Sequence, residues 1–356
     1  PAGSMRRTVI LIMLAACGAA LAVGVGISVS SPSSPPKPDG YQHLRLRVGS
    51  DVYHYTVFTP VSLRAGSPVP LVVVLHGCST TADQQAAASS YDPIAERLRF
   101  VVLYPDVDPV DEANGRCWKG IWEPGAEGRG RGDAGAIAEM TRAVIARWRI
   151  DRARVYVIGI SAGAFETAIL GADYPDLYAA IGIHSGAAYL GGEQGCLAAN
   201  ELARAAFAAM GARARVMPVI VFHGDQDGKI PYQCGQQALT QWLGTDDLIL
   251  RHERRAALQP TPTGFTPKPV AGGHPYTVRS YADRSGCVTA QLWTIHGMGH
   301  FWSGGSADPA SARYSDPRGP SAAAASWAFF SRWRLSGPAR PCPHLRSGHG
   351  PLRAAG

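Results

Sequence analysis

The sequence Arg-Val-Tyr-Val-Ile-Gly-Ile-Ser-Ala-Gly, residues 154–163, joins an apolar run to a Gly-x-Ser-x-Gly motif. The β-branched residues of the run predict a strand, and Ala162–Leu170 predicts a helix directly after it. A serine on such a tight turn has its hydroxyl pushed out above the sheet, because the flanking glycines have no Cβ atoms to clash there. The amide end of the following helix favours negative charge at the same place. Ser161 is therefore the predicted nucleophile.

The composition is that of an ordinary globular protein with a sizeable core. The chain has 356 residues, of which 46% are hydrophobic and 17% are charged, which excludes a disordered protein. The formal net charge of +7 comes almost wholly from arginine, and the arginines are scattered along the chain. Because no basic run is interleaved with aromatic residues, we predict a solvated basic surface and no nucleic-acid partner.

The N-terminal segment predicts that the body of the protein lies outside the cytoplasm. We interpret residues 1–4, ahead of Met5, as a remnant of cloning. The uncharged apolar segment Thr8–Val29 is typical of a signal peptide or a membrane anchor, and Leu14–Cys17 also resembles a lipoprotein box. We favour a cleaved signal peptide because the apolar residues continue well past Cys17. The protein is expected to be secreted or attached to the cell envelope, and to meet the membrane only through this segment if it is uncleaved.

Strand and helix patterns alternate between residues 41 and 335, which predicts one catalytic domain. A Ser/Pro-rich linker, residues 31–40, precedes it, and a Pro/Gly/Arg-rich tail, residues 336–356, follows it. Such alternation predicts an α/β fold, a mostly parallel sheet with helices on both faces. The predicted strands are Leu44–Val48, Tyr53–Thr59, Pro70–Leu75, Phe100–Tyr104, Val155–Ile158, Ala179–Ile183, Val216–Phe222, Tyr276–Tyr281 and Gln291–Ile295. The predicted helices are Ala82–Leu98, Ala134–Trp148, Ala162–Leu170, Leu197–Met210, Gln236–Leu243 and Pro320–Trp333.

A carboxylate follows the serine at the position that a catalytic triad needs. A nucleophilic serine requires a base to take its proton and a carboxylate to orient that base. In α/β-hydrolases these residues come in the order serine, acid, histidine, each on a loop after a strand. Asp227 lies just past the predicted strand Val216–Phe222, and Asp225 is the alternative. We favour Asp227 because two further residues let the turn carry its carboxylate towards the histidine, while Asp225 would stabilise the turn.

Two histidines follow the predicted strand Gln291–Ile295. His296 belongs to the end of the strand, whereas His300 lies beyond Gly297 and Gly299 on a loop that can reach over the serine. His300 is therefore the predicted base. The spacing of the two histidines also suggests a metal site, but the intervening glycines argue against a helix that presents both. Since the sequence contains no other ligand cluster, we predict neither a metal nor a cofactor.

Two backbone amides are expected to bind the oxyanion that forms during acyl transfer. One belongs to Ala162, directly after the nucleophile, and the other should come from the loop after Pro70–Leu75, where Cys78 is the candidate. His76 either holds this loop by a hydrogen bond or is an incidental turn residue.

Five motifs lie at these positions: Leu75–Cys78, Cys117-Trp118, Gly159–Gly163, His184–Gly186 and Gly297–Gly305. Together they resemble the polyhydroxybutyrate-depolymerase and feruloyl-esterase-like family of secreted esterases, over about residues 41–335. The resemblance implies an α/β-hydrolase fold with Ser161, Asp227 and His300 as the triad. It also implies that Cys78 lends its amide to the oxyanion hole.

The pattern predicts an exported serine esterase that hydrolyses carboxylic esters through an acyl-enzyme. Short hydroxyalkanoate or polyester, aryl-acid and acetyl esters are all candidate substrates, either small or polymeric, and we expect a monomer. Trp118, Trp122 and Trp302 are candidates for the substrate cleft, and the alternative is that they pack under long loops. An acyltransferase that uses the same triad is the second hypothesis for the function.

A non-catalytic surface-binding protein is a third hypothesis, and the tripeptide Arg131-Gly132-Asp133 is the only signal for it. This tripeptide has the sequence of an integrin-type ligand. A simpler interpretation is that Asp133 caps the predicted helix Ala134–Trp148.

Six cysteines lie outside the export segment, which predicts disulfides in an exported chain: Cys78, Cys117, Cys196, Cys234, Cys287 and Cys342. The first four follow strands and so lie at the catalytic edge of the sheet, whereas Cys287 and Cys342 lie at the opposite edge. A disulfide needs Cα atoms within roughly 7 Å, and a strand spans about 17–20 Å, so cysteines at opposite edges should not pair. We predict Cys287–Cys342, then Cys78–Cys117 because these two leave neighbouring strands, and Cys196–Cys234 as the remaining pair.

Overall fold

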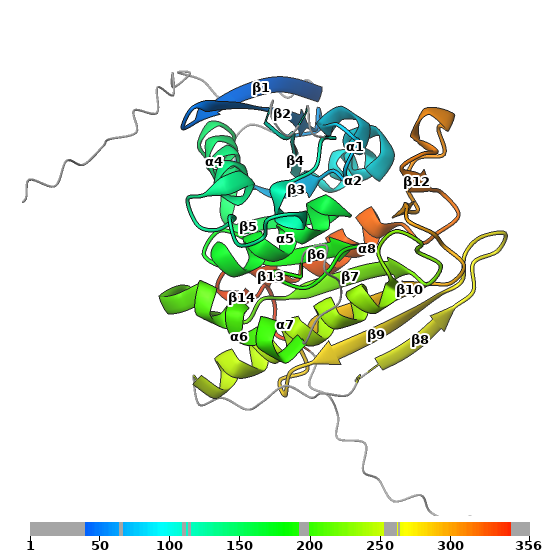
Figure 1. Cartoon of the computed structure of the whole chain (residues 1–356). Helices are drawn as coiled ribbons and strands as arrows, with labels where there is room; N and C mark the ends of the chain where they lie inside the picture. The colour runs from blue at the N-terminus through cyan, green and yellow to red at the C-terminus, as the bar shows by residue number, and fades with distance from the viewer. Residues whose placement is uncertain are drawn as a thin grey trace, which may run out of the picture. The chain divides into compact units, whose positions relative to one another are not determined.

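The apolar runs of the sequence form the strands of a ten-stranded sheet in the computed structural model (Figure 1). The structure describes residues 40–342 except 64–66, 109–111, 113–114, 192–198, 253–261 and 263. The predicted export segment, the linker before residue 40 and the end of the tail lie outside these residues. Among the described residues, none of the helices is both long and apolar enough to cross a membrane.

The sheet is parallel in its centre and antiparallel at both edges. Strands β3, β4, β5, β6, β7 and β10 pair in parallel, whereas β1–β2, β2–β4, β10–β9 and β9–β8 are antiparallel. From the top of Figure 1 to the bottom, the order is β1 (Gly40–Val48), β2 (Asp51–Thr59), β4 (Val101–Pro105), β3 (Val69–Leu75), β5 (Ile150–Ile160), β6 (Ala180–His184), β7 (Val219–Gly224), β10 (Val288–Ile295), β9 (Tyr276–Ala282) and β8 (Gly264–Lys268).

Helices pack on both faces of the sheet, as the alternation of side chains along β3 illustrates. Leu71, Val73 and Leu75 belong to one core and Val72 and Val74 to the other, because successive strand residues point to opposite faces. Each of these fully buried side chains contributes about 1.5–3 kcal/mol to folding. The first core includes residues of α4 (Gly132–Arg147), α5 (Ala162–Asp173), α6 (Ala199–Met210) and α7 (Tyr232–His252), and the second includes α1 (Ala82–Ser89), α2 (Tyr91–Leu98) and α8 (Ala322–Phe330). The predicted fold class is confirmed.

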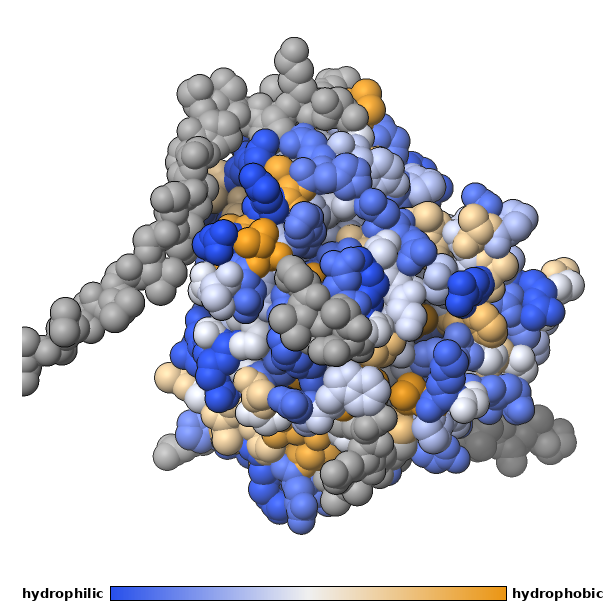
Figure 2. All heavy atoms as spheres, turned by 45° about the horizontal axis from the view of Figure 1, so that its top comes forward, coloured by the Kyte–Doolittle hydropathy of each residue, from blue (hydrophilic) through white to orange (hydrophobic). Residues whose placement is uncertain are grey.

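Short elements complete the chain in the loops. They are the 3₁₀ turns η1 (Lys119–Ile121), η2 (Gly211–Arg213) and η3 (Pro309–Ser311), and two small two-stranded sheets. In these sheets β11 (Trp302–Ser303) pairs with β12 (Ser315–Asp316), and β13 (Trp333–Arg334) pairs with β14 (Gly337–Pro338). The face shown in Figure 2 is largely hydrophilic, with hydrophobic residues in small groups among hydrophilic ones.

The parallel pairing determines where the candidate site lies. The carboxyl ends of β3, β5, β7 and β10 lie at one edge of the sheet, so the loops that follow these strands gather there. These loops carry His76–Cys78, Ser161, Asp225–Asp227 and His296–His300.

One predicted helix is broken into two. The pattern predicts a single helix over Ala82–Leu98, but the structure ends α1 at Ser89 and starts α2 at Tyr91. Ser90 between them has the left-handed backbone angle φ 58°. The reason is Pro93, which has no N–H to donate to the Ser89 carbonyl and is tolerated only in the first turn of a helix. The broken helix places the α1 residues against the candidate site.

The predicted cap of α4 is also wrong. Arg131 occupies the capping position, and Asp133 is fully buried in the first turn. The Asp133 carboxylate accepts hydrogen bonds from the Tyr53 hydroxyl at 3.1 Å and from the Lys119 amide at 2.8 Å. It therefore anchors the loop that precedes α4. Because the carboxylate has no exposed surface, the Arg131–Asp133 tripeptide does not present an integrin-type ligand.

Two of the three predicted disulfides are confirmed. Cys78 is bonded to Cys117 and Cys287 to Cys342, with Cα separations of 4.3 Å and 5.1 Å. The second bond attaches residues 336–342 of the tail to the start of β10. Cys234 is also disulfide-bonded, whereas Cys196, its predicted partner, lies outside the described residues. That pairing stays a prediction.

Candidate active site

The backbone at Ser161 has a conformation that only a tightly packed turn maintains. Ser161 lies between β5 and α5 with φ 55° and ψ −125°, a region that non-glycine residues rarely adopt. A Cβ atom on Gly159 would lie 2.1 Å from the Gly163 carbonyl oxygen, and one on Gly163 would lie 2.5 Å from the His76 carbonyl oxygen. Both glycines of the motif are therefore required for close packing, and the turn directs Ser161 to the edge of the sheet.

Asp227 and His300, the predicted acid and base, lie in contact with each other. The His300 Nδ1 atom lies 2.8 Å from the Asp227 Oδ2 atom, and the other carboxylate oxygen accepts hydrogen bonds from the amides of Lys229 and Ile230 at 2.9 Å each. Burial alone would raise the pKa of Asp227. The contacts with His223 and His300 and with the Ile230 amide instead hold this pKa well below its ordinary value. An ionised carboxylate in this contact is suited to keep the imidazole proton on Nδ1 and to leave Nε2 as an acceptor.

The two alternative residues form a second pair with each other. The His296 Nδ1 atom lies 2.8 Å from the Asp225 Oδ2 atom, and the His296 Nε2 atom lies 2.8 Å from the Thr277 hydroxyl. Asp225 also accepts a hydrogen bond of 2.7 Å from the Gly297 amide. Hydrogen bonds to this amide and to His296 help to hold the pKa of Asp225 below its ordinary value against the effect of burial. This pair ties the start of the His300 loop to the Asp227 loop.

A pocket of about 840 Å³ is lined by Ser161 and His300 together. Neither Asp225 nor His296 lines it. Its walls come from the loop after β3, from α1, from η1 and from the loops after β7 and β10. A pocket of this volume is typical of a site for a small organic ligand. Ser161 and His300 thus lie at one concave site, although they are far apart in the sequence.

The loop after β3 supplies a backbone donor beside Ser161. Cys78 lines the pocket, and a Cβ on Gly77 would lie 3.2 Å from the Ser161 Cβ. Ala162 begins α5, so its amide has no partner within the helix. The amides of Cys78 and Ala162 donate to no acceptor among the described residues. Two unpaired donors beside the nucleophile are suited to an oxyanion.

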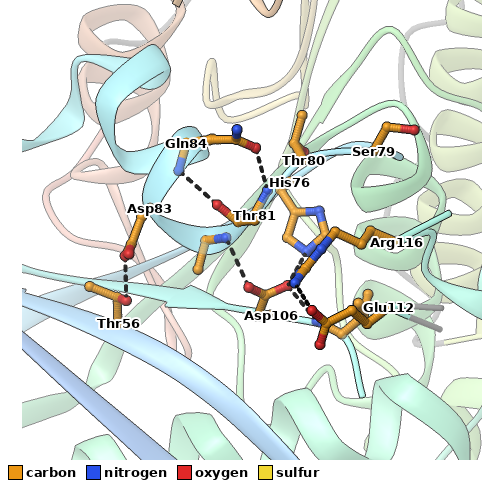
Figure 3. Close-up of polar contacts among 12 residues, drawn as sticks. Thr56, His76, Ser79, Thr80, Thr81, Asp83, Gln84, Asp106, Glu112 and Arg116 are labelled. Carbon is orange, nitrogen blue, oxygen red and sulfur yellow. Dashed lines mark hydrogen bonds and ion pairs between the residues drawn. The ribbon is translucent and has the colours of Figure 1, made fainter. Parts of the chain in front are cut away.

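Polar contacts hold this loop in place (Figure 3). The fully buried His76 contacts the Gly77 carbonyl through Nδ1 at 2.7 Å, and its Nε2 lies 3.2 Å from the Asp106 carboxylate. Arg116 lies on the same carboxylate at 2.9 Å. Burial would raise the pKa of Asp106, but His76 and Arg116 hold it below its ordinary value. His76 thus supports the loop through a charged network.

Trp118 and Trp302 are not exposed to the pocket, which corrects the predicted substrate-binding role. Both side chains are fully buried. The Trp118 Nε1 donates a hydrogen bond of 2.9 Å to the His76 carbonyl, so Trp118 supports the loop after β3 from below. Trp122 is half exposed, but it does not line the pocket, whereas its neighbour Ile121 does. Phe301, beside Trp302 in the sequence, supplies the aromatic wall instead.

His184, to which the sequence pattern gave no role, connects Ser161 to the His300 loop. Its backbone carbonyl accepts a hydrogen bond of 3.0 Å from the Ser161 amide. Its ring stacks on Trp302 with centroids 5.1 Å apart, and its Nε2 accepts a hydrogen bond of 3.0 Å from the Ser303 amide. Burial lowers the pKa of His184 to about 3, so the ring is neutral and remains an acceptor. The sequence signal that could have identified His184 is its position at the carboxyl end of a predicted strand, the edge where the site lies.

A buried carboxyl pair lies under the pocket wall. Glu166, one turn into α5, accepts a hydrogen bond of 3.2 Å from the Gly120 amide, and Glu127 accepts one of 2.8 Å from the Ala134 amide. Burial raises the pKa of both side chains, and the charges of Glu127 and Asp133 raise the pKa of Glu166 further. Neither glutamate is singled out by the sequence pattern, because the two are far apart along the chain and only the fold brings them together. Across the described residues, no group of three or more His, Cys, Asp or Glu side chains is placed to hold a metal ion.

Comparisons with known proteins identify the family to which this chain is similar. The model of a family described as esterase PHB depolymerase matches residues 53–259. Poly(3-hydroxyalkanoate) depolymerase C of Paucimonas lemoignei is 30% identical over 259 residues, which are 71% of this chain and 59% of that protein. Feruloyl esterase B of Neurospora crassa is 26% identical over 220 residues, covering 54% of this chain and 71% of that protein.

A solved structure shows the same fold. The acetyl xylan esterase from Aspergillus awamori superposes with a TM-score of 0.59 at 21% identity, over 74% of this chain and 94% of that chain. The depolymerase is longer than the matched region, and the chain spans less than two thirds of its length.

Proposed function

Because the chain belongs to the esterase PHB depolymerase family, we propose that it is a serine esterase that hydrolyses carboxylic esters through an acyl-enzyme on Ser161. The observation that carries the proposal is the Asp227–His300 contact of 2.8 Å at the pocket that Ser161 also lines. His300 acts as general base and Asp227 orients it. The relatives named above as depolymerase, feruloyl esterase and acetyl xylan esterase support the same class of reaction.

The proposed mechanism uses only side chains and amides of this chain. His300 takes the Ser161 proton through Nε2 while the serine oxygen bonds to the ester carbonyl carbon. The amides of Cys78 and Ala162 bind the oxyanion of the tetrahedral intermediate. As the intermediate collapses, the ester C–O bond breaks and His300 returns the proton to the leaving alcohol. Water then attacks the acyl-enzyme by the same steps, which releases the acid and restores Ser161.

The substrates that we propose are esters of short acyl groups: short hydroxyalkanoate, acetyl or aryl-acid esters, either small or at the end of a polymer. A pocket of about 840 Å³ is large enough for such groups. We further propose that the protein is exported. The two disulfides among the described residues support this, because disulfides persist in oxidising compartments.

The test is Ser161→Ala, measured on chromogenic esters of rising acyl length and with a fluorophosphonate label. Ser161→Ala should lose at least about 10³-fold in turnover and all of the label, with an unchanged circular dichroism spectrum. Ser79→Ala is the matched control, since Ser79 lines the same pocket, and it should retain both activity and label. Full activity in folded Ser161→Ala protein would refute the proposal. Transfer of most acyl groups to an added alcohol at low concentration would instead indicate an acyltransferase.

A further inference from the structure

Every His, Lys, Arg, Asp or Glu side chain that lines the pocket is basic. Besides His300 they are Lys229, from the loop after β7, and Arg313, from the loop between η3 and β12. No aspartate or glutamate is among the lining residues that the structure describes. The nearest carboxylate in sequence, Asp227, is already occupied by His300 and by two backbone amides. The pocket is therefore electropositive beside the candidate nucleophile.

Neither cation is neutralised within the described part of the chain. Although many basic residues of this protein form ion pairs, the Lys229 ammonium and the Arg313 guanidinium have no ion pair or hydrogen bond among the described residues. The guanidinium lies over the Tyr314 ring at 5.8 Å, and Tyr314 also lines the pocket. Both cations are exposed and so can meet a ligand.

The backbone holds the two cations at fixed places relative to the candidate triad. Lys229 is two residues from Asp227 in the sequence, and its backbone amide donates a hydrogen bond to the Asp227 carboxylate. The Lys229 backbone therefore lies beside the proposed acid. The Tyr314 carbonyl accepts a hydrogen bond of 2.8 Å from the Trp302 amide, which ties the Arg313 segment to the His300 loop. Both side chains thus start from backbone that is tied to the loops of Asp227 and His300.

A buried amide provides an independent sign of a polar ligand. Gln85 on α1 is 2% exposed and lines the pocket, and its side-chain Nε2 has no hydrogen-bond partner. A buried donor without a partner costs about 1–3 kcal/mol. An oxygen acceptor on a ligand would satisfy it. The η3 turn, just before Arg313, packs on α1, so Gln85 and Arg313 lie on neighbouring walls.

We propose that this pocket selects esters that carry a free carboxylate near the scissile bond, such as monoesters of dicarboxylic acids or short carboxylate-ended oligoesters. Lys229 and Arg313 pair with the carboxylate, and Gln85 donates to a ligand oxygen. The inference rests on the proposed esterase function and deepens it. A solvated lysine is common on any surface, but two unpaired cations, no acid and an unsatisfied buried donor in one pocket together favour an anionic ligand.

The test compares matched acidic and neutral esters. Mono(4-nitrophenyl) glutarate and 4-nitrophenyl pentanoate differ by a carboxylate on the acyl side. For the alcohol side, 3-acetoxybenzoate and its methyl ester differ in the same way. We expect at least one acidic ester to have a kcat/KM above that of its neutral partner, and the favoured pair identifies the side that carries the charge. The preference should arise from KM and should shrink as salt rises from 20 mM to 500 mM, about the range over which surface charges become screened.

Variants then assign the preference to residues. Lys229→Gln and Arg313→Gln should each lower the acidic-to-neutral ratio of kcat/KM about fivefold, the upper range for an exposed ion pair. Arg45→Gln on β1 is the matched control, since Arg45 is exposed, lies on the edge strand and does not line the pocket; it should not change the ratio. Gln85→Leu should raise KM for the acidic ester more than for the neutral one.

The outcomes separate this proposal from the esterase function. Hydrolysis of neutral esters at equal or higher kcat/KM than acidic ones, with no difference between Lys229→Gln and Arg45→Gln, would refute the charge preference and leave the esterase function standing. If wild-type protein hydrolysed neither acidic nor neutral esters, the esterase function and the preference in hydrolysis would both be refuted. Binding of the glutarate monoester to Ser161→Ala protein, measured by calorimetry, would then decide the binding claim: affinity that Lys229→Gln weakens supports it, and absence of binding refutes it.

Discussion

The Asp225 carboxylate lies 2.8 Å from His296 Nδ1, in the same two loops that hold the Asp227–His300 pair at the same distance. Two aspartate–histidine pairs therefore lie side by side in sequence, and only one of them includes a residue of the pocket. The other pair is bonded to the Gly297 amide and to Thr277. We infer that Asp227 orients the base and that Asp225 positions the loop that carries it.

Substitution of the two aspartates should separate these roles. Asp227→Asn should lower kcat by about 10³–10⁴-fold, because an amide at this position favours the wrong tautomer of His300. Asp225→Asn should lower kcat less than about tenfold, and it should lower the free energy of unfolding instead. Steady-state kinetics on a chromogenic ester together with urea unfolding would measure both effects. The reverse ranking in kcat would transfer the orienting role to Asp225.

Asp92 predicts a pH dependence of stability remote from the pocket lining. Its buried carboxyl accepts hydrogen bonds from the hydroxyls of Tyr104 and Tyr41, and burial raises its pKa to about 6. Since the folded pKa is higher than the unfolded one, this group stabilises the fold fully below about pH 4, and that contribution is lost as the pH rises through 6. The loss is about 3 kcal/mol if the whole shift counts.

Asp92→Asn should remove this dependence, because the amide cannot ionise. The difference in the free energy of unfolding between the variant and the wild type should shift in favour of the variant between pH 4 and pH 7, as measured by urea denaturation at each pH. Other titrating groups cancel in this difference. A difference that stays constant across the range would show that Asp92 keeps an ordinary pKa.

The two disulfides should differ in their effect on activity but not on stability. They close loops of 39 and 55 residues, and the chain-entropy relation assigns about 4 kcal/mol to each. Only Cys78–Cys117 supports a proposed oxyanion donor. Cys117→Ser with Cys78→Ser should therefore lower both the melting temperature and kcat, whereas Cys287→Ser with Cys342→Ser should lower the melting temperature alone.

Cys287→Ser with Cys342→Ser serves as the matched control for the loss of any disulfide. The comparison is made below both melting temperatures, so that unfolding does not affect kcat. Equal kcat in the two double variants would mean that the first disulfide has no special role at the oxyanion site.

Much of the fold was predictable because its signals are local. Buried parallel strands need continuous apolar runs, as in β3 and β5. The turn at Ser161 needs glycines, because a Cβ atom at Gly159 or Gly163 would clash with the backbone. The mostly parallel pairing of the strands could then be inferred from their alternation with helices. For this reason the sheet edge that holds Ser161, and the two disulfides at opposite edges, followed from the sequence.

The failures concern side chains whose surroundings come from distant parts of the chain. Trp118 and Trp302 are large aromatic residues near the site, as is typical of a substrate cleft, yet their side chains are buried against His76 and His184. Asp133 has the sequence position of a cap, yet Tyr53 and Lys119 capture its carboxylate. For Trp118 and Asp133 a long-range hydrogen bond outweighed the local preference, because a buried polar group is stable only with a partner. Trp302 instead gains ring packing against His184.

By itself, then, the sequence predicted the fold class, the Gly-x-Ser-x-Gly turn and the order of the candidate triad, since each rests on a local pattern: alternating apolar runs, a single motif, or a polar residue that directly follows a predicted strand. Only the tertiary structure decided which aspartate faces which histidine, because both candidates of each kind lie within four residues of each other. It alone placed Lys229, Arg313 and Gln85 around one pocket. These residues come from three separate loops or helices, and no periodicity links them, so their proximity exists only once the strands have paired and brought their loops to one edge.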